Sequence, residues 1–211
     1  MKYRLATFDF DGTLADSGAW FLTIFNELAD QFGFQRIEHH NQELLRNHSA
    51  AEILKQLKVP KWKLPQLMIQ VRKYSARDWK NIKLFPGTEK MLSALRTAGL
   101  QVAIVSSNSE QTIRNVLGPE IAAAIHHYAC GASLFGKAAK LRSVLRKTRV
   151  IPPESIYIGD EIRDAVAARE VGMAFGAVSW GYTAPTALDR EKPTIRFTTV
   201  PEILEKLSFT S

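Results

Sequence analysis

Short apolar stretches alternate along the chain with longer segments in which apolar residues recur every three or four positions. The short stretches end at glycine or polar residues, so they predict strands over residues 3–10, 101–105, 127–130, 155–158 and 174–178. Helical spacing follows over residues 88–98, 110–117, 137–147 and 162–171, and a last helix begins near residue 201. This alternation predicts an α/β fold with a parallel, Rossmann-like sheet.

One part of the chain breaks the alternation. Between the first two predicted strands the pattern is helical throughout, and we expect helices over residues 20–32, 42–57 and 64–79. The α/β core is therefore expected to consist of residues 1–14 and 85–211, with residues 15–84 inserted as an all-helical unit.

The composition is that of a globular protein. The 211 residues are 45% hydrophobic and 23% charged, which excludes a disordered or fibrous chain. No stretch approaches the roughly 18 apolar residues of a membrane span, and the first residues lack the cleavage site of a secretory signal. The single cysteine, Cys130, can form neither an internal disulfide nor a cysteine metal site. These features favour a cytoplasmic protein without a membrane partner, and they fit either an enzyme or a binding module.

The formal net charge of +7 is concentrated in the second half of the helical segment. Against the single acidic residue Asp78, this stretch holds nine basic residues: Lys55, Lys58, Lys61, Lys63, Arg72, Lys73, Arg77, Lys80 and Lys83. Such a stretch attracts an anionic substrate, a nucleic acid or an acidic partner, or it is a solvated helix face. The polar residues Arg46, Asn47 and His48, earlier in the segment, are interpreted as a solvated face rather than as a wall of a binding site.

Polar residues suited to catalysis follow several of the predicted strands. Those at strand ends are Asp9, Asp11, Ser106, Ser107, Asn108, Asp160, Glu161 and Asp164, and Lys137 begins a helix. Because the carboxyl ends of parallel strands meet at one edge of a sheet, several carboxylates would converge there. Their mutual repulsion calls for a cation, and hard oxygen ligands without a cysteine or histidine cluster favour Mg²⁺.

Asp9 and Asp11 are separated by the period of an extended chain, so both can face the same side of the strand end. One of them could act as a nucleophile and the other as a general acid and base. A carboxylate that attacks phosphorus forms an aspartyl-phosphate, and Lys137 and the Ser106 hydroxyl would then hold the phosphoryl oxygens. Each residue alone has an ordinary structural explanation, since Asp-Gly is a common turn and Ser-Asn often caps a helix.

Two stretches carry a resemblance to a known family. Residues 9–17, with the sequence DFDGTLADS, and residues 159–164, with the sequence GDEIRD, resemble the first and fourth motifs of the haloacid dehalogenase superfamily. Ser106 and Lys137 are similar to its second and third motifs, although Ala138 follows Lys137 where the family often has proline. The resemblance implies a haloacid dehalogenase-like core, and the helical segment lies where the subgroup of phosphoglycolate phosphatase carries its cap domain.

The resemblance also implies a role for each site residue. Asp9 would be the nucleophile and a Mg²⁺ ligand, and Asp11 would be the general acid and base, binding the metal through its backbone carbonyl. Asp160 would complete the metal site. Ser106 would bind the phosphoryl group, Lys137 would stabilise its charge, and Asp164 and Glu161 would support the site. The second motif can also be placed one residue later, so that Ser107 and Asn108 bind substrate.

The expected function is a Mg²⁺-dependent phosphatase that hydrolyses a small, phosphoglycolate-like phosphomonoester. Asp11 favours this chemistry, because members of the family that resemble dehalogenases or phosphonatases lack an aspartate at that position. A phosphomutase of the same superfamily and a nucleic-acid- or protein-binding module that uses the basic helical segment are the alternatives. We expect a small phosphorylated substrate rather than nucleic acid as the partner, a monomer or homodimer, and a site rim formed by Trp180, Gly181 and Tyr182.

Overall fold

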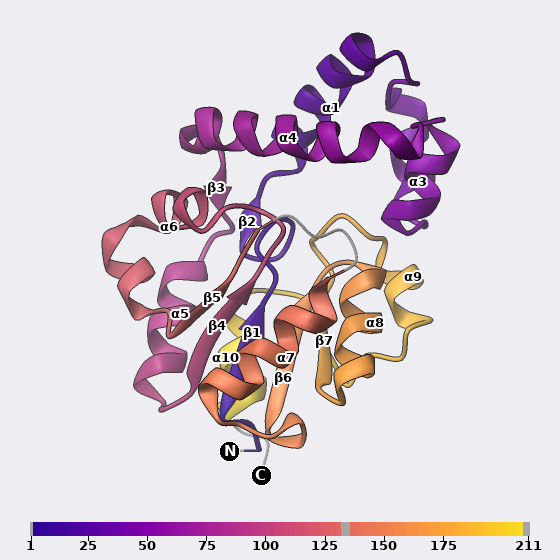
Figure 1. Cartoon of the computed structure of the whole chain (residues 1–211). Helices are drawn as coiled ribbons and strands as arrows, with labels where there is room; N and C mark the ends of the chain where they lie inside the picture. Colours follow the sequence, from indigo (N-terminus) through magenta and orange to yellow (C-terminus); the bar gives the residue numbers. More distant parts are fainter. Residues whose placement is uncertain (1, 132–135, 209–211) are drawn as a thin grey trace.

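The computed structural model describes residues 2–131 and 136–208. Its centre is a six-stranded parallel sheet in the order β5-β4-β1-β6-β7-β8 (Figure 1). The strands are β1 (Leu5–Phe8), β4 (Gln101–Val105), β5 (His127–Ala129), β6 (Ser155–Gly159), β7 (Ala174–Val178) and β8 (Ile195–Phe197). The predicted α/β class is confirmed. The edge strand β8 was not predicted, because the exposed Arg196 stands between its two apolar residues and leaves no apolar run.

Helices cover both faces of the sheet (Figure 1). On one face lie α5 (Thr88–Thr97), α6 (Glu110–Ala124) and α10 (Pro201–Ser208), and on the other lie α7 (Lys137–Thr148), α8 (Ile162–Val171) and α9 (Pro185–Asp189). The central strand serves both layers, since Ala6 and Phe8 pack into the first and Leu5 packs into the second. This burial on both sides explains why the strands read as continuous apolar runs.

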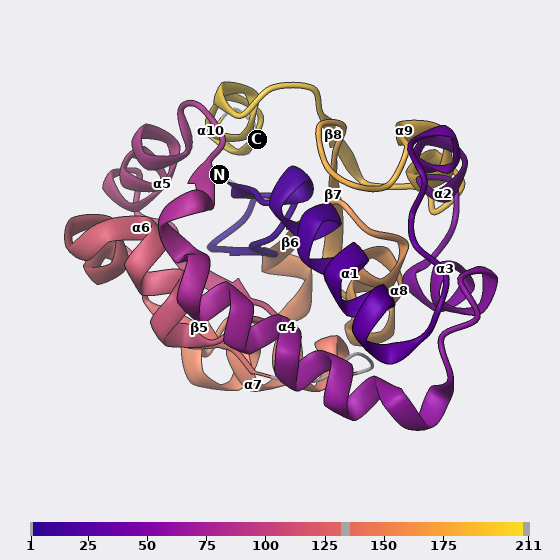
Figure 2. The same cartoon turned by 90° about the horizontal axis from the view of Figure 1, so that it is seen from above.

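The helical segment lies over the carboxyl ends of the strands (Figure 1), and α1 and α4 cross above the sheet in the view from above (Figure 2). It comprises α1 (Gly18–Phe32), α2 (Gln42–Leu45), α3 (Ala50–Gln56) and α4 (Leu64–Asp78). Single 3-10 turns occur at His39–Asn41, Lys61–Lys63 and Trp79–Asn81, and another at Pro152–Glu154 in the core. The segment has an apolar cluster of its own, in which Phe25, Leu28 and Leu67 are buried.

The chain enters and leaves the helical segment through two adjacent short strands. These are β2 (Ala15–Asp16) and β3 (Lys83–Leu84), which pair antiparallel with Ala15 opposite Leu84. Two-residue strands carry no readable hydrophobic pattern, and the sequence did not predict them. Their pairing holds both connections at one place beside the carboxyl end of β1 (Figure 1).

The prediction of one helix over residues 42–57 is wrong, because the structure has the two helices α2 and α3 there. The second begins with a capping box: the Ser49 backbone N–H donates to the Glu52 carboxylate at 2.8 Å, and the Glu52 N–H donates to the Ser49 hydroxyl at 3.4 Å. This pair satisfies the free N–H groups of a new helix start. Among the helices of the described residues, none is long and apolar enough to cross a membrane.

Candidate active site

The carboxyl end of the central strand holds a buried ion pair. Asp9 directly follows β1, and its backbone N–H still pairs with the carbonyl of Ile158 in β6 at 2.9 Å. The Lys137 ammonium, at the first residue of α7, donates to Asp9 Oδ2 at 2.6 Å, and both side chains are almost fully buried. Burial alone would lower the pKa of Lys137, but Asp164 and Asp9 outweigh it and raise the pKa, so the lysine is charged.

Asp164 is the second carboxylate that contacts the Lys137 ammonium. Its oxygens also accept hydrogen bonds from the Tyr157 hydroxyl at 2.9 Å and from the Glu161 backbone N–H at 3.1 Å, which forms part of the cap of α8. Glu161 lies farther from the ammonium, at 4.0 Å, and pairs with Arg163. Asp164 therefore contacts the ammonium directly, whereas Glu161 lies at the edge of ion-pair distance.

Asp160 is fully buried beside this pair and is held by two hydrogen bonds. Its carboxylate accepts from the Thr13 hydroxyl at 2.7 Å and from the Tyr182 backbone N–H at 2.8 Å. Two glycines allow the surrounding backbone to come this close. A Cβ atom at Gly12 would lie 2.3 Å from Asp160 Oδ2, and one at Gly181 would lie 2.1 Å from the Asp160 Cβ. Gly12 also has a φ of +77°, which other residues rarely adopt.

Three of these carboxylates form a group that fits a metal ion. One oxygen from each of Asp9, Asp160 and Asp164 lies within 4.8 Å of the others. Burial raises the pKa of Asp9 to about 7 in spite of Lys137, and burial together with the neighbouring carboxylates raises the pKa of Asp160 well above its usual range. Buried carboxylates in such a cluster repel one another, and a bound cation would reduce this repulsion. Their oxygens are the hard donors that Mg²⁺ and Ca²⁺ prefer.

Asp11 lies apart from this group and faces the cavity described below. Its Oδ1 accepts a hydrogen bond from the Ser17 hydroxyl at 2.8 Å, and that hydroxyl is 2.6 Å from the Tyr182 hydroxyl. Burial raises the pKa of Asp11, against the hydrogen bonds from Ser17 and Asn108 that lower it. A carboxyl with a raised pKa is suited to carrying a proton.

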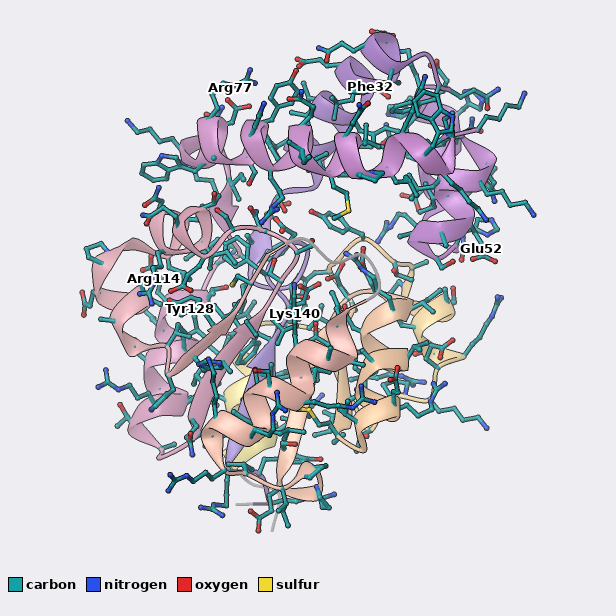
Figure 3. All side chains as sticks on the ribbon, in the orientation of Figure 1. Phe32, Glu52, Arg77, Arg114, Tyr128 and Lys140 are labelled. Carbon is teal, nitrogen blue, oxygen red and sulfur yellow. The ribbon has the colours of Figure 1, made fainter. Side chains whose placement is uncertain are left out.

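The residues after β4 divide into two roles. Ser106 is buried, and its hydroxyl accepts a hydrogen bond from the Asn108 N–H at 3.0 Å. Its carbonyl accepts from the Lys140 ammonium at 2.6 Å, and Lys140 lies on α7 (Figure 3). Ser107 and Asn108 instead line the cavity, and Asn108 is hydrogen-bonded to Ser75 of α4 at 2.9 Å. This geometry is compatible with both placements of the second motif.

A cavity of about 560 Å³ lies between the sheet edge and the helical segment. From the core it is lined by polar residues such as Asp11, Asn108 and Glu161. From the helical segment it is lined mainly by apolar residues: Phe21, Phe25, Ile53, Leu54, Leu64, Leu67, Met68 and Val71. A volume of this size is typical of sites for small molecules.

Arg46 and His48 also line this cavity, so their interpretation as a purely solvated face is wrong. Arg46 reaches across to the core, where its guanidinium donates to the carbonyls of Tyr182 at 3.2 Å and Gly181 at 3.3 Å. The predicted rim of Trp180, Gly181 and Tyr182 does line the cavity. Helical periodicity alone could not show which polar face of the segment turns toward the core.

Sequence reasoning missed three residues that hold the site together. Thr13 and Ser17 lie inside the first motif, and their hydroxyls bind Asp160 and Asp11. Tyr157 lies two residues before Gly159 in β6, where its hydroxyl meets Asp164. The signal for all three was a hydroxyl group within or close to a motif that contains carboxylates.

A comparison with known protein families identifies the family of this chain. The profile of the family "Haloacid dehalogenase-like hydrolase" matches residues 6–178. This chain belongs to the haloacid dehalogenase-like hydrolases. The predictions of the family and of an enzyme are thereby confirmed, and the matched residues include every predicted site residue from Asp9 to Asp164.

Individual relatives cover nearly the whole chain. The phosphoglycolate phosphatase of Synechococcus elongatus is 30% identical over 202 residues, which are 95% of each chain. The tyrosine-protein kinase PtkA of Mycobacterium tuberculosis is 28% identical over 210 residues, which are 97% of this chain and 72% of the kinase. A haloacid dehalogenase-like hydrolase from Streptococcus pneumoniae has the same fold, with a TM-score of 0.81, 22% identity and coverage of 98% of this chain and 99% of its own.

Proposed function

We propose that the protein is a Mg²⁺-dependent phosphatase that hydrolyses a small phosphorylated metabolite through an aspartyl-phosphate on Asp9. The observation that carries this proposal is the buried Asp9–Lys137 pair of 2.6 Å beside Asp160, at the carboxyl end of the central strand. The similarity to a phosphoglycolate phosphatase over 95% of both chains supports a phosphomonoester as the substrate. The relative named as a kinase shows that overall similarity is not sufficient to assign the reaction, so the proposal depends on the site itself.

The carboxylates of Asp9 and Asp160 and the backbone oxygen of Asp11 would hold the metal ion. When bound, Mg²⁺ would neutralise the phosphoryl oxygens and favour the ionised form of the carboxylates around it. Asp164 is already engaged by Lys137, Tyr157 and the cap of α8, so we assign it a supporting role.

In the first half of the proposed reaction, a carboxylate oxygen of Asp9 attacks phosphorus and the bond from phosphorus to the leaving oxygen breaks. Asp11 gives its proton to that oxygen, which its raised pKa favours. Lys137 and the Ser106 hydroxyl would bind the phosphoryl oxygens. The product is an aspartyl-phosphate and a free alcohol.

In the second half, Asp11 takes a proton from a water molecule as that water attacks phosphorus. The bond between phosphorus and the Asp9 oxygen breaks, which releases inorganic phosphate and restores the Asp9 carboxylate. Asp11 is then protonated again, as the next cycle requires. The same group thus serves as acid and then as base.

We further propose that residues 15–84 form a cap domain that closes over the substrate and excludes water. The paired strands β2 and β3 support this, because they confine both connections to one place where a hinge can act. A cytoplasmic monomer or homodimer remains our expectation, which cell fractionation and size-exclusion chromatography would test.

The experiment that tests the reaction measures phosphate release from a panel of phosphorylated metabolites, with and without Mg²⁺. The proposal expects release by the wild type only with Mg²⁺ and none above background by Asp9→Asn. The matched control is Asp30→Asn, which makes the same change at an exposed position in the helical segment and should keep full activity. Near-normal release by Asp9→Asn would contradict the mechanism. Transfer of the phosphoryl group to a second sugar hydroxyl, without release, would instead support a phosphomutase.

A further inference from the structure

The nine basic residues in the second half of the helical segment differ in how exposed they are, since two of them are partly buried. The other seven have exposed side chains, including Arg77 on the outer side of α4 (Figure 3). Lys63 donates to the carbonyl of Phe32. Arg72 is the one member of the nine that lines the cavity described above. Net charge alone would have treated all nine alike.

Arg72 lies on the face of α4 that is attached to the core. Met68, Val71, Arg72 and Ser75 share this face at helical spacing, and all four line the cavity. The buried hydroxyl of Ser75 is hydrogen-bonded to Asn108, which fixes this end of the face to the loop after β4. Arg72 comes one turn earlier. Its Nη2 atom lies 3.7 Å from the position of a Cβ on Gly131, whose N–H donates to the Asn108 carbonyl at 2.9 Å.

The guanidinium of Arg72 has unused hydrogen-bonding capacity. Its Nε atom is buried and has no hydrogen-bond partner, and no carboxylate in residues 2–131 and 136–208 forms an ion pair with it. The other two arginines that line the cavity are occupied, because Arg46 binds core carbonyls and Glu43, and Arg163 binds Glu161. Buried donors without a partner are rare, since leaving one unsatisfied is costly.

We infer that Arg72 binds a second anionic group, a carboxylate or a phosphate, on the part of the substrate that leaves. The inference rests on the proposed phosphatase function and deepens it. The guanidinium presents donors in a fixed fork that matches such groups. Its place next to the loop of Ser107 and Asn108 puts this second anion close to the phosphoryl group. Arg72 is therefore a specificity-determining residue, which selects substrate and takes no part in the transfer itself.

The test compares Arg72→Gln with the wild type on three substrates. Ethyl phosphate has no second anion, 2-phosphoglycolate adds a carboxylate, and glycerol 1,3-bisphosphate adds a phosphate. Arg72→Gln should lower kcat/KM by about 10- to 100-fold for the substrates with a second anion and by less than about twofold for ethyl phosphate. The substrate with the larger loss identifies the anion. The control Lys73→Gln removes the same charge from an exposed position of α4 and should change none of the three values.

A binding measurement separates this inference from the proposed reaction. Calorimetry with Mg²⁺ would compare Asp9→Asn with Asp9→Asn/Arg72→Gln, using the same three compounds as ligands. The inference expects the two ligands with a second anionic group to bind tighter than ethyl phosphate only when Arg72 is present, whether or not the wild type shows turnover. Equal loss of affinity for all three compounds, or no loss for any, would overturn it. Turnover that fails while this difference in binding persists would contradict the phosphatase proposal alone.

Discussion

The two sides of the cavity differ in how their charged groups are used. On the core side Arg163 pairs with Glu161. At the sheet edge behind this wall, Lys137 contacts Asp9 and Asp164, and Asp160 accepts from Thr13 and the Tyr182 backbone. On the side of the helical segment the wall is mainly apolar, and Arg72 has an unpaired, buried Nε. The core side is organised before any ligand arrives, as a reaction centre must be. The opposite side leaves its specific contact to be completed by the substrate.

This contrast predicts that mutations on the core side reduce both activity and stability, whereas mutations on the side of the helical segment change the choice of substrate. The core residues hold one another in place, so the loss of one leaves buried charges without partners. A residue whose hydrogen-bonding groups have no partner in the protein itself contributes little to the free energy of unfolding. The following substitutions test the comparison in order of expected effect.

The largest effect is expected for Lys137→Met. Removing the ammonium leaves Asp9 and Asp164 buried without a cation, which should lower the free energy of unfolding by about 3–5 kcal/mol and abolish phosphate release. Urea denaturation followed by circular dichroism measures the first quantity. Lys147→Met is the control, because it removes an exposed lysine from the same helix and should change stability by less than about 0.5 kcal/mol. A loss below about 1 kcal/mol for Lys137→Met would contradict the importance of the pair.

Gly12→Ala should mainly affect the position of Asp160. The new Cβ would lie 2.3 Å from Asp160 Oδ2, so the carboxylate must move, and we expect a loss of about 100-fold in Mg²⁺-dependent kcat/KM. Gly99→Ala separates this contact from backbone strain, because Gly99 also has a positive φ, of +88°, but its Cβ would meet nothing within 4 Å. Titration of activity with Mg²⁺ provides the measurement. Equal losses in the two variants would show that strain, and not Asp160, is responsible.

A smaller effect is expected at the contact between the two sides of the cavity. Ser75→Ala removes the hydroxyl that binds the Asn108 side chain and leaves a buried amide partly unsatisfied. We expect a loss of about 1–2 kcal/mol in the free energy of unfolding. The preference for a second anion should also weaken, since Arg72 would be held less firmly over the loop. Ala76, the exposed next residue on α4, provides the control as Ala76→Ser. If Ser75→Ala kept both its free energy of unfolding and its preference for substrates with a second anion, the proposed role of the Ser75–Asn108 contact would be contradicted.

The last prediction concerns the reactivity of Cys130 and, through the ionisation of its thiol, the dependence of stability on pH. Burial raises the pKa of its thiol to about 12, so the folded protein holds it neutral at pH 8. Alkylation by iodoacetamide at pH 8 should be on the order of a thousandfold slower in the folded protein than in urea. Because the unfolded thiol ionises at lower pH, this group favours unfolding as the pH rises above about 8.5. Rapid labelling of the folded protein, followed by mass spectrometry, would contradict this assignment.

The sequence was sufficient to predict the sheet and most of the residues brought to its edge. Asp9, Asp11 and Asp160 directly follow or end apolar runs. In a parallel sheet the carboxyl ends of neighbouring strands lie at the same edge, so these residues are brought together there. The break at Ser49, the paired strands β2 and β3, and the edge strand β8 were not predictable from periodicity. The break depends on a local hydrogen bond, β2 and β3 have two residues each, and β8 has a charged residue at its centre.

The side of the helical segment was the harder part to predict. Arg72 and Lys73 are adjacent and carry the same charge, yet the first lines the cavity and the second is exposed. The face of α4 that carries Arg72 also carries Ser75, whose hydrogen bond to Asn108 is a tertiary contact between residues 33 positions apart. A pattern along one helix contains no information about a partner so far away in the chain.

The central claim is that Asp9 is phosphorylated during turnover, and chemical trapping tests it most directly. The enzyme would be mixed with Mg²⁺ and its best substrate, quenched in acid within the first turnovers, reduced with borohydride and digested for mass spectrometry. Reduction of an aspartyl-phosphate converts the aspartate to homoserine, so we expect homoserine at position 9 in the wild type and none in a sample quenched without substrate. Unmodified Asp9 under conditions of rapid phosphate release, or homoserine at Asp11 instead, would contradict the account.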